Sequence, residues 1–139
     1  MDTGTFFQNV ASALACDLRR AEALTFAVLQ ELRARLTPKE RADIAAQLPT
    51  PLKRLWEGTP PAGDAVHKLH RDEFIGRVRV WAGLPDDHEA ERAVRVVFRN
   101  LQRVLGRATG LEGEAWDVFS LLPKDLKLLW VEAAQQSGR

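Results

Sequence analysis

Residues 48–56 read LPTPLKRLW and residues 122–130 read LPKDLKLLW, and this repeated stretch decides the fold. Leucine, proline, leucine, lysine, leucine and tryptophan recur at identical spacing in the two copies. The residue that precedes a proline disfavours helical dihedrals, so each copy predicts that a helix ends at its leucine–proline pair. The leucines and the tryptophan that follow are spaced as on a short helix. The chain is therefore expected to form the same helix–turn–helix corner at two places.

The similarity between the two parts of the chain extends toward the N-terminus of each stretch. Apolar residues align there at matching spacing: Phe6, Val10, Val28, Leu29 and Leu32 match Phe74, Val78, Val97, Phe98 and Leu101. Self-similarity over roughly fifty residues usually means a repeated supersecondary unit. We therefore predict one unit at residues 3–58 and a second at residues 71–134. Residues 59–70 form the expected linker, because proline and glycine gather at its start.

Each unit is expected to contain about four helices, because apolar residues recur at helical spacing and no alternating strand pattern occurs. In the first unit the helices are expected at about residues 6–14, 19–36, 38–48 and 52–56, with a capping box of Thr37 and Glu40 before the third. In the second unit they are expected at about residues 72–83, 86–107 and 111–121, and in a last short segment that ends near Glu132. Asp72 is the expected N-cap of the first of these helices and Gly83 its expected left-handed cap.

The two units are expected to pack against each other. A single unit would expose too much apolar helix surface to be stable alone, so the simplest arrangement is an all-α, pseudo-symmetric helical bundle within one domain. Trp56 and Trp130 would then lie at equivalent places in the core or at its edge. A dimer in which units pair between chains is the alternative, since the linker would allow it.

Composition sets further bounds on the protein. The chain has 139 residues, a formal net charge of +1 and one cysteine, Cys16. A chain of this length buries roughly two-thirds of its extended surface, so stability requires neither disulfides nor a metal. No global field attracts it to nucleic acid or membrane, and no apolar run approaches the ~20 residues that span a bilayer. We expect a cytoplasmic protein without a signal peptide or membrane contact.

The residues also resemble those of a known family. Phe6 and Val10, residues 27–29 and 31–32, Arg35-Leu36 and above all Ala46-Gln47-Leu48-Pro49 are similar to the bacterial domain-of-unknown-function family 2267. The resemblance implies a small helical protein whose repeats carry an Ala-Gln-Leu-Pro element, with no assigned catalytic site to transfer. The second unit departs from this pattern, because Ser120-Leu121-Leu122-Pro123 stands where that element is expected.

The most regular surface pattern is a row of five arginines on the long helix of the second unit: Arg92, Arg95, Arg99, Arg103 and Arg107. At ~100° per residue they fall within about 120° of arc, opposite the apolar side of the helix. No acidic residue lies between the first and the last of them, so this arginine row is expected to face solvent. Guanidinium groups there suit phosphates or carboxylates. The alternative is a solvated face, or one paired with acids of a neighbouring helix such as Glu114 or Asp117.

Other reactive residues give weaker patterns. His67 and His70, with Asp64 and Asp72 nearby, have spacing that a metal could use, but structural zinc sites have tighter, cysteine-rich spacing, so no metal is expected. His88 is interpreted as a helix-start residue, and Cys16 as a small buried apolar one, since no base lies near it. Trp81 and Trp116 could line a pocket, although aromatics at helical spacing more often belong to the core.

The sequence therefore predicts a non-catalytic protein, because no catalytic triad, glycine-rich phosphate loop or paired-carboxylate spacing occurs. No cofactor is expected. A protein-interaction or regulatory module with an unknown protein partner is the preferred hypothesis, as a monomer or homodimer. Binding of nucleic acid or another polyanion through the arginine row is the second hypothesis, and an enzyme with a pocket of perturbed ionisable groups is the third.

Overall fold

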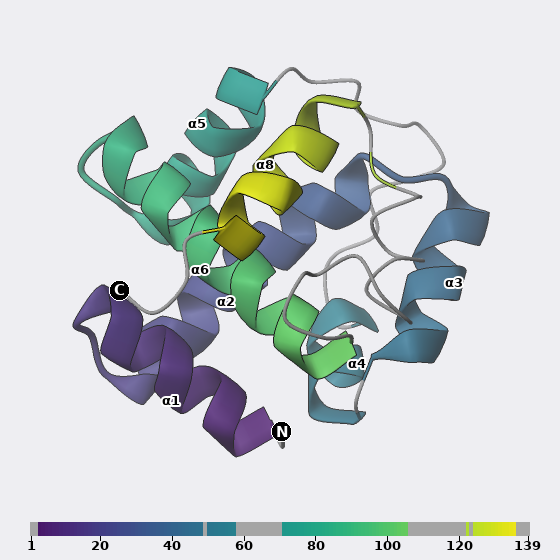
Figure 1. Cartoon of the computed structure of the whole chain (residues 1–139), viewed down its shortest axis with the longest axis horizontal. Helices are drawn as coiled ribbons and strands as arrows, with labels where there is room; N and C mark the ends of the chain where they lie inside the picture. Colours follow the sequence, from purple (N-terminus) through teal and green to yellow (C-terminus); the bar gives the residue numbers. More distant parts are fainter. Residues whose placement is uncertain (1–2, 49, 58–70, 106–121, 123, 136–139) are drawn as a thin grey trace.

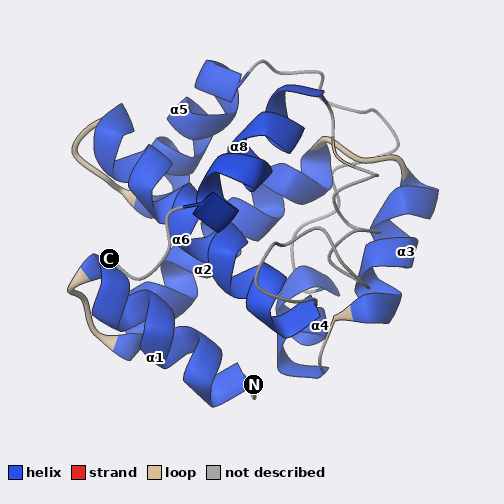
Figure 2. Cartoon of the chain, in the orientation of Figure 1, coloured by secondary structure: helices blue, strands red, loops and turns tan. Residues whose placement is uncertain are grey.

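The computed structural model describes residues 3–48, 50–57, 71–105, 122 and 124–135 (Figure 1). Every regular element in these ranges is an α-helix, as Figure 2 shows, so the predicted all-α fold is confirmed. The helices are α1 (Thr3–Leu14), α2 (Leu18–Ala34), α3 (Pro38–Gln47), α4 (Thr50–Glu57), α5 (Arg71–Ala82), α6 (Asp87–Leu105) and α8 (Lys124–Gln135). The expected linker, the expected helix at residues 111–121 and Arg107 lie outside the described residues.

Local capping signals set where the helices begin. The predicted capping box before α3 is confirmed: the Glu40 amide donates to Thr37 Oγ1 at 3.2 Å, and the Thr37 amide donates to Glu40 Oε1 at 2.9 Å. Asp17, which the sequence analysis did not single out, caps α2 by accepting from the Arg20 amide at 2.7 Å. The prediction that Asp72 is an N-cap was wrong, because α5 already begins at Arg71. Its carboxylate lies inside the first turn, where negative charge favours the helix dipole.

The end of α5 follows the prediction made from its glycine. Gly83 has a φ of 65°, and its amide donates to the Val80 carbonyl at 3.3 Å while the next amide, of Leu84, donates to the Arg79 carbonyl at 3.0 Å. These are the two hydrogen bonds of a Schellman motif. Gly83 is therefore the left-handed cap that separates α5 from the long helix α6.

The two longest helices, α2 and α6, lie at the centre of the bundle (Figure 1). Helix α1 packs on both of them, and so does α5; α4 packs on α2, and α8 packs on α6. The contacts of α1, α2 and α4 thus have counterparts in those of α5, α6 and α8. This is the arrangement expected of a pseudo-symmetric bundle.

The core contains both members of the residue pairs on which the repeat was argued. Phe6 and Phe74, Val10 and Val78, Val28 and Val97, Leu32 and Leu101, and Trp56 and Trp130 are all buried. Trp130 packs on Phe98 with ring centroids 5.3 Å apart, and the Trp56 indole donates to the Arg41 carbonyl at 3.2 Å. The duplication itself stays a prediction, because amphipathic helices of independent origin would also bury their apolar residues.

Candidate functional site

The arginine row lies along α6, but its members have different surroundings. Arg92 and Arg103 are exposed, whereas Arg95 and Arg99 are half-buried. Arg92 Nη2 donates to the Ala13 carbonyl at 2.8 Å, in the last turn of α1, and Nη1 lies 3.6 Å from the Glu89 carboxylate. A cation is favourable at a helix C-terminus because unpaired carbonyls gather there. Arg92 therefore joins α6 to α1.

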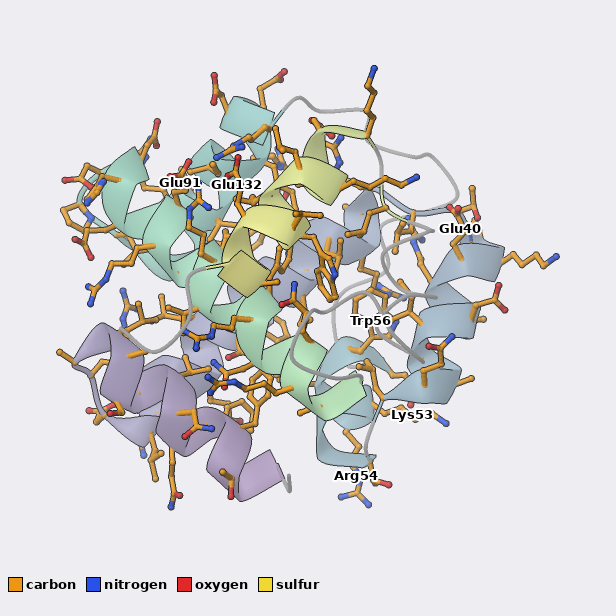
Figure 3. The ribbon with its side chains drawn as sticks, in the orientation of Figure 1. Glu40, Lys53, Arg54, Trp56, Glu91 and Glu132 are labelled. Carbon is orange, nitrogen blue, oxygen red and sulfur yellow. The ribbon has the colours of Figure 1, made fainter. Side chains whose placement is uncertain are left out.

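Arg95 belongs to an ion-pair network that joins three helices. Its Nη2 lies 2.8 Å from Glu132 Oε1 of α8 and 3.3 Å from Glu91 Oε2 of α6, and Arg71 Nη2 of α5 lies 3.1 Å from Glu91 and 3.2 Å from Glu132. Figure 3 labels Glu91 and Glu132, which lie next to one another where α6 meets α8. We call Arg71, Glu91, Arg95 and Glu132 the charge network.

The contacts within the charge network shift the pKa values of Arg71, Glu91 and Glu132. Burial alone would raise the pKa of Glu91 and of Glu132, but the hydrogen bonds and charges of Arg71 and Arg95 outweigh it, and both pKa values are lowered. Burial would likewise lower the pKa of Arg71, yet its hydrogen bonds to the two carboxylates raise it. All three shifts favour the charged forms, so Arg71, Glu91 and Glu132 are ionised at neutral pH.

Arg92 is exposed, as expected for the row, but the expectation that the row faces solvent was wrong for Arg95, and both arginines have acidic partners. The acids that contact them lie just before the row, at Glu89 and Glu91, or on another helix, at Glu132. Pairing with a neighbouring helix was the alternative interpretation, and for Arg95 that helix is α8. The acids then named, Glu114 and Asp117, lie outside the described residues, as does Arg107.

The second half of the row places two arginines one helical turn apart on α6. The pKa of Arg99 is lowered, first by burial and then by the charge of Arg103. Two guanidinium groups at this spacing could both donate to one bound anion.

A different surface, on α5, exposes large apolar side chains. Val80 is 69% exposed and Trp81 is 55% exposed. The expectation that Trp81 belongs to the core was wrong: the buried side of α5 consists of Phe74, Ile75, Val78 and Ala82, and Trp81 lies beside that stripe. Trp116, considered with it, lies outside the described residues.

The solvent side of α5 also carries a glycine and two charged residues. We call Glu73, Gly76, Arg77, Val80 and Trp81 the α5 outer face. A Cβ added at Gly76 would meet no atom within 4 Å, so the glycine leaves a notch open to solvent. Arg77 Nε donates to Glu31 Oε1 of α2 at 2.6 Å; the arginine side chain is 46% exposed and the carboxylate only 2%. The outer face is therefore anchored to the core by one buried ion pair.

Helix α1, which the predicted repeat pairs with α5, carries no such surface. The predicted repeat aligns the α5 outer face with residues of α1 that are polar and uncharged, or small: Thr5, Gln8, Asn9, Ser12 and Ala13. Of these, Gln8, Ser12 and Ala13 are exposed. The two helices thus occupy corresponding positions and differ on the side that meets solvent.

A small acidic hollow lies between the starts of α5 and α6. Asp72, Ile75, Asp87, His88 and Glu91 line a volume of about 150 Å³. His88 lies in the first turn of α6, in agreement with its interpretation as a helix-start residue. Within residues that the structure describes, no group of three or more histidine, cysteine or acidic side chains has the geometry to hold a metal. His67, His70 and Asp64 lie outside those residues.

Cys16 lies after the end of α1 and packs, half-buried, against the core. Burial raises the pKa of its thiol and Asp17 raises it further, while Arg20 opposes them. A raised pKa keeps the thiol protonated, which is the inert form. Its surroundings favour the structural interpretation given to it from the sequence.

Comparison with known proteins places the chain in a family. The model of a family described as "Uncharacterized conserved protein (DUF2267)" matches residues 3–129. No curated protein matches the chain. In the part of the chain that the structure describes, no helix is both long enough and apolar enough to cross a membrane. The match spans α1 to α6 and the first half of α8, and the chain belongs to the DUF2267 family.

Proposed function

We propose that this protein is a non-catalytic interaction module that binds a protein partner through the α5 outer face. The observation that carries the proposal is the exposure of Val80 and Trp81, 69% and 55%, on a helix whose other side is fully packed. Tryptophan and arginine are enriched among the residues that dominate protein interfaces. A rigid helix presents them at little entropic cost on binding.

The ion pair of Arg77 with Glu31 supports the same surface. Nε is occupied by the buried carboxylate, and the partly exposed guanidinium still presents donors to solvent. A partner that brings a carboxylate beside an apolar side chain would match Arg77 and Val80 together. Arginine is suited to this role because its planar group donates in several directions at once.

The test is affinity capture from the native extract, in which wild type is compared with the double variant Val80→Ser, Trp81→Ala. These substitutions introduce the residues that α1 carries at the matching positions, Ser12 and Ala13, so the helix is expected to form normally. Leu128→Ser is the control, because Leu128 is 57% exposed on α8. We expect proteins retained by wild type and by the control to be lost with the double variant. Equal recovery with all three would refute the proposal.

Polyanion binding is the second candidate, and the placement of Arg99 and Arg103 four residues apart on α6 favours it. Two guanidinium groups at this spacing could both donate to one phosphate. It predicts binding of single- or double-stranded nucleic acid that weakens steeply with salt, since each phosphate contact releases counterions. Arg99→Gln with Arg103→Gln should abolish this binding. If binding is absent at low salt, the second candidate is wrong.

A further inference from the structure

We propose that the α5 outer face binds a second copy of this chain, with the two α5 helices antiparallel and crossing at Gly76. This inference rests on the proposed interaction function and names its partner. Three features of the α5 outer face support it: the spacing of the exposed residues, the shape of the helix at Gly76, and the charges of Glu73 and Arg77.

The spacing of the exposed residues is self-complementary. Glu73, Gly76, Arg77 and Val80 are separated by three, one and three positions, so the spacing between them is the same when the helix is reversed. Residues at these spacings lie on one side of a helix. A two-fold axis between Gly76 and Arg77 would place Gly76 opposite the partner copy's Arg77, and Glu73 opposite its Val80. Self-complementarity of this kind is what a two-fold symmetric interface requires.

Gly76 gives the α5 outer face a shape that a second helix can approach closely. Helix axes usually pack about 8–10 Å apart, a distance set by the side chains at the contact. Gly76 has no side chain and nothing within 4 Å of the position where a Cβ would be, so it leaves room for the side chain of a facing helix. A glycine inside an exposed helix destabilises that helix relative to other residues. Close approach of a second helix would give a physical reason for a glycine at position 76, which the isolated helix does not favour.

The charges complement each other across the same axis. In the antiparallel arrangement Glu73 lies within about one helical turn of the partner copy's Arg77, and symmetry repeats the pair. Arg77 is 46% exposed and is held in position by Glu31, so its guanidinium is fixed before a partner arrives. Trp81 flanks the contact and would cover its edge. In a parallel pair of helices, Glu73 would face the partner copy's Glu73 and Arg77 would face the partner copy's Arg77. The repulsion between these like charges disfavours the parallel arrangement.

The contact between the two α5 helices is small, so the dimer is expected to be weak. A helix of 12 residues is roughly 18 Å long, and one such crossing buries less than the ~1,200 Å² typical of stable complexes. We therefore expect a reversible dimer with a dissociation constant on the order of 10–100 µM. The full-length chain should be monomeric when dilute and dimeric when concentrated.

Sedimentation velocity of the full chain over a range from roughly one-tenth to ten times that constant tests the inference. The decisive variant is Gly76→Gln, which gives α5 the residue that α1 carries at Gln8. It should abolish association at every concentration and at the same time raise the melting temperature of the dilute protein by roughly 2–4 °C, because glutamine favours helix more than glycine does. Loss of association together with a gain in stability cannot come from unfolding. Ala42→Gln, at an exposed position of α3, is the control and should leave association unchanged.

The outcomes separate this inference from the proposed function. A wild-type chain that stays monomeric throughout, or a Gly76→Gln chain that associates like wild type, overturns the second-copy inference. If the wild type is monomeric but Val80→Ser with Trp81→Ala still loses captured proteins, the interaction function stands with another partner. If neither association nor capture depends on the α5 outer face, both proposals fail.

Discussion

Ala15 and Gly83 adopt the same left-handed backbone conformation, with φ values of 54° and 65°, after the ends of α1 and α5. Each is followed by the same hydrogen bond: the Cys16 amide donates to the Ala11 carbonyl and the Leu84 amide to the Arg79 carbonyl, both at 3.0 Å. The two helices therefore end in one type of Schellman motif. Glycine adopts this conformation without steric cost, whereas the Cβ of alanine makes it unfavourable by roughly 1 kcal/mol.

The first prediction exchanges the residues at these two caps. Ala15→Gly should raise the free energy of unfolding by about 0.5–1 kcal/mol, because it removes the strain of a left-handed alanine. Gly83→Ala should lower it by about 1 kcal/mol; no atom lies within 4 Å of the new Cβ, so the loss would come from the backbone alone. Urea unfolding followed by circular dichroism measures both. A decrease with Ala15→Gly would show that this cap is not strained.

The second prediction concerns the buried carboxylate of Glu31. Arg77→Ala removes the partner at 2.6 Å and leaves a side chain that is only 2% exposed without its charged neighbour. Such a loss typically destabilises by about 3 kcal/mol, because the remaining charge is not solvated. Arg79→Ala is the matched control, since Arg79 pairs with the exposed Asp87 on the surface of the same helix, and it should cost less than about 0.5 kcal/mol. Equal losses in urea unfolding would contradict the special role of Arg77.

The features that were predicted correctly depend on residues that lie close together in the sequence. The Thr37–Glu40 capping box spans three positions, and the left-handed cap at Gly83 needs only a glycine at a helix end. Apolar spacing located α2 and α6 to within one or two residues at the ends that the structure describes. The cap at Ala15 was missed because alanine gives no such signal. Asp72 was misplaced because a capping residue and a first-turn acid look alike in sequence.

The ion pairs that join the surface arginines to other helices could not be predicted from the sequence, because they depend on how the helices pack. Glu91 and Arg95 lie four residues apart and could have been paired from the sequence, but Glu132 is 37 positions from Arg95, and Glu31 is 46 positions from Arg77. Those contacts are set by the packing of α8 on α6 and of α5 on α2, which apolar periodicity does not give. Trp81 was different: the stripe of Phe74, Ile75, Val78 and Ala82 already placed it beside the buried side of its helix. The core interpretation of Trp81 rested on its helical spacing from Phe74 and Val78 and did not consider the position of Ile75 and Ala82.

The third prediction is the pH dependence of the charge network. The pKa values of Glu91 and Glu132 are lowered in the folded protein, so their contribution to stability is present above the unfolded pKa and is lost as pH falls through the folded one. Glu132→Gln should therefore destabilise at pH 7 by about 0.5–1 kcal/mol, as expected for partly exposed pairs in a network. The deficit should shrink below ~pH 4 and disappear in stronger acid. Thermal unfolding of wild type and variant across this range measures it, and a deficit that is independent of pH would show that charge is not its cause.

The last prediction concerns the ion pair between Arg35, the C-cap residue of α2, and Asp125 of α8. Arg35 Nη2 lies 2.8 Å from Asp125 Oδ1, and the arginine side chain is only 5% exposed. Arg35 Nε, Arg35 Nη1 and Asp125 Oδ2 are buried without a hydrogen-bond partner, and burial lowers the pKa of Arg35 in spite of the neighbouring carboxylate. The pair thus bears a desolvation penalty that one hydrogen bond offsets only in part.

Removing one partner or both should therefore have different consequences. Arg35→Met alone leaves Asp125 without its cation and should destabilise by about 1–3 kcal/mol, and Asp125→Leu alone leaves the buried guanidinium unpaired and should cost about 3 kcal/mol or more. The double variant Arg35→Met, Asp125→Leu removes both charges and should recover most of that loss, reaching a stability close to or above that of wild type. Urea unfolding of the four proteins gives the coupling energy directly. If the losses of the single variants simply add, the two residues do not act as a pair.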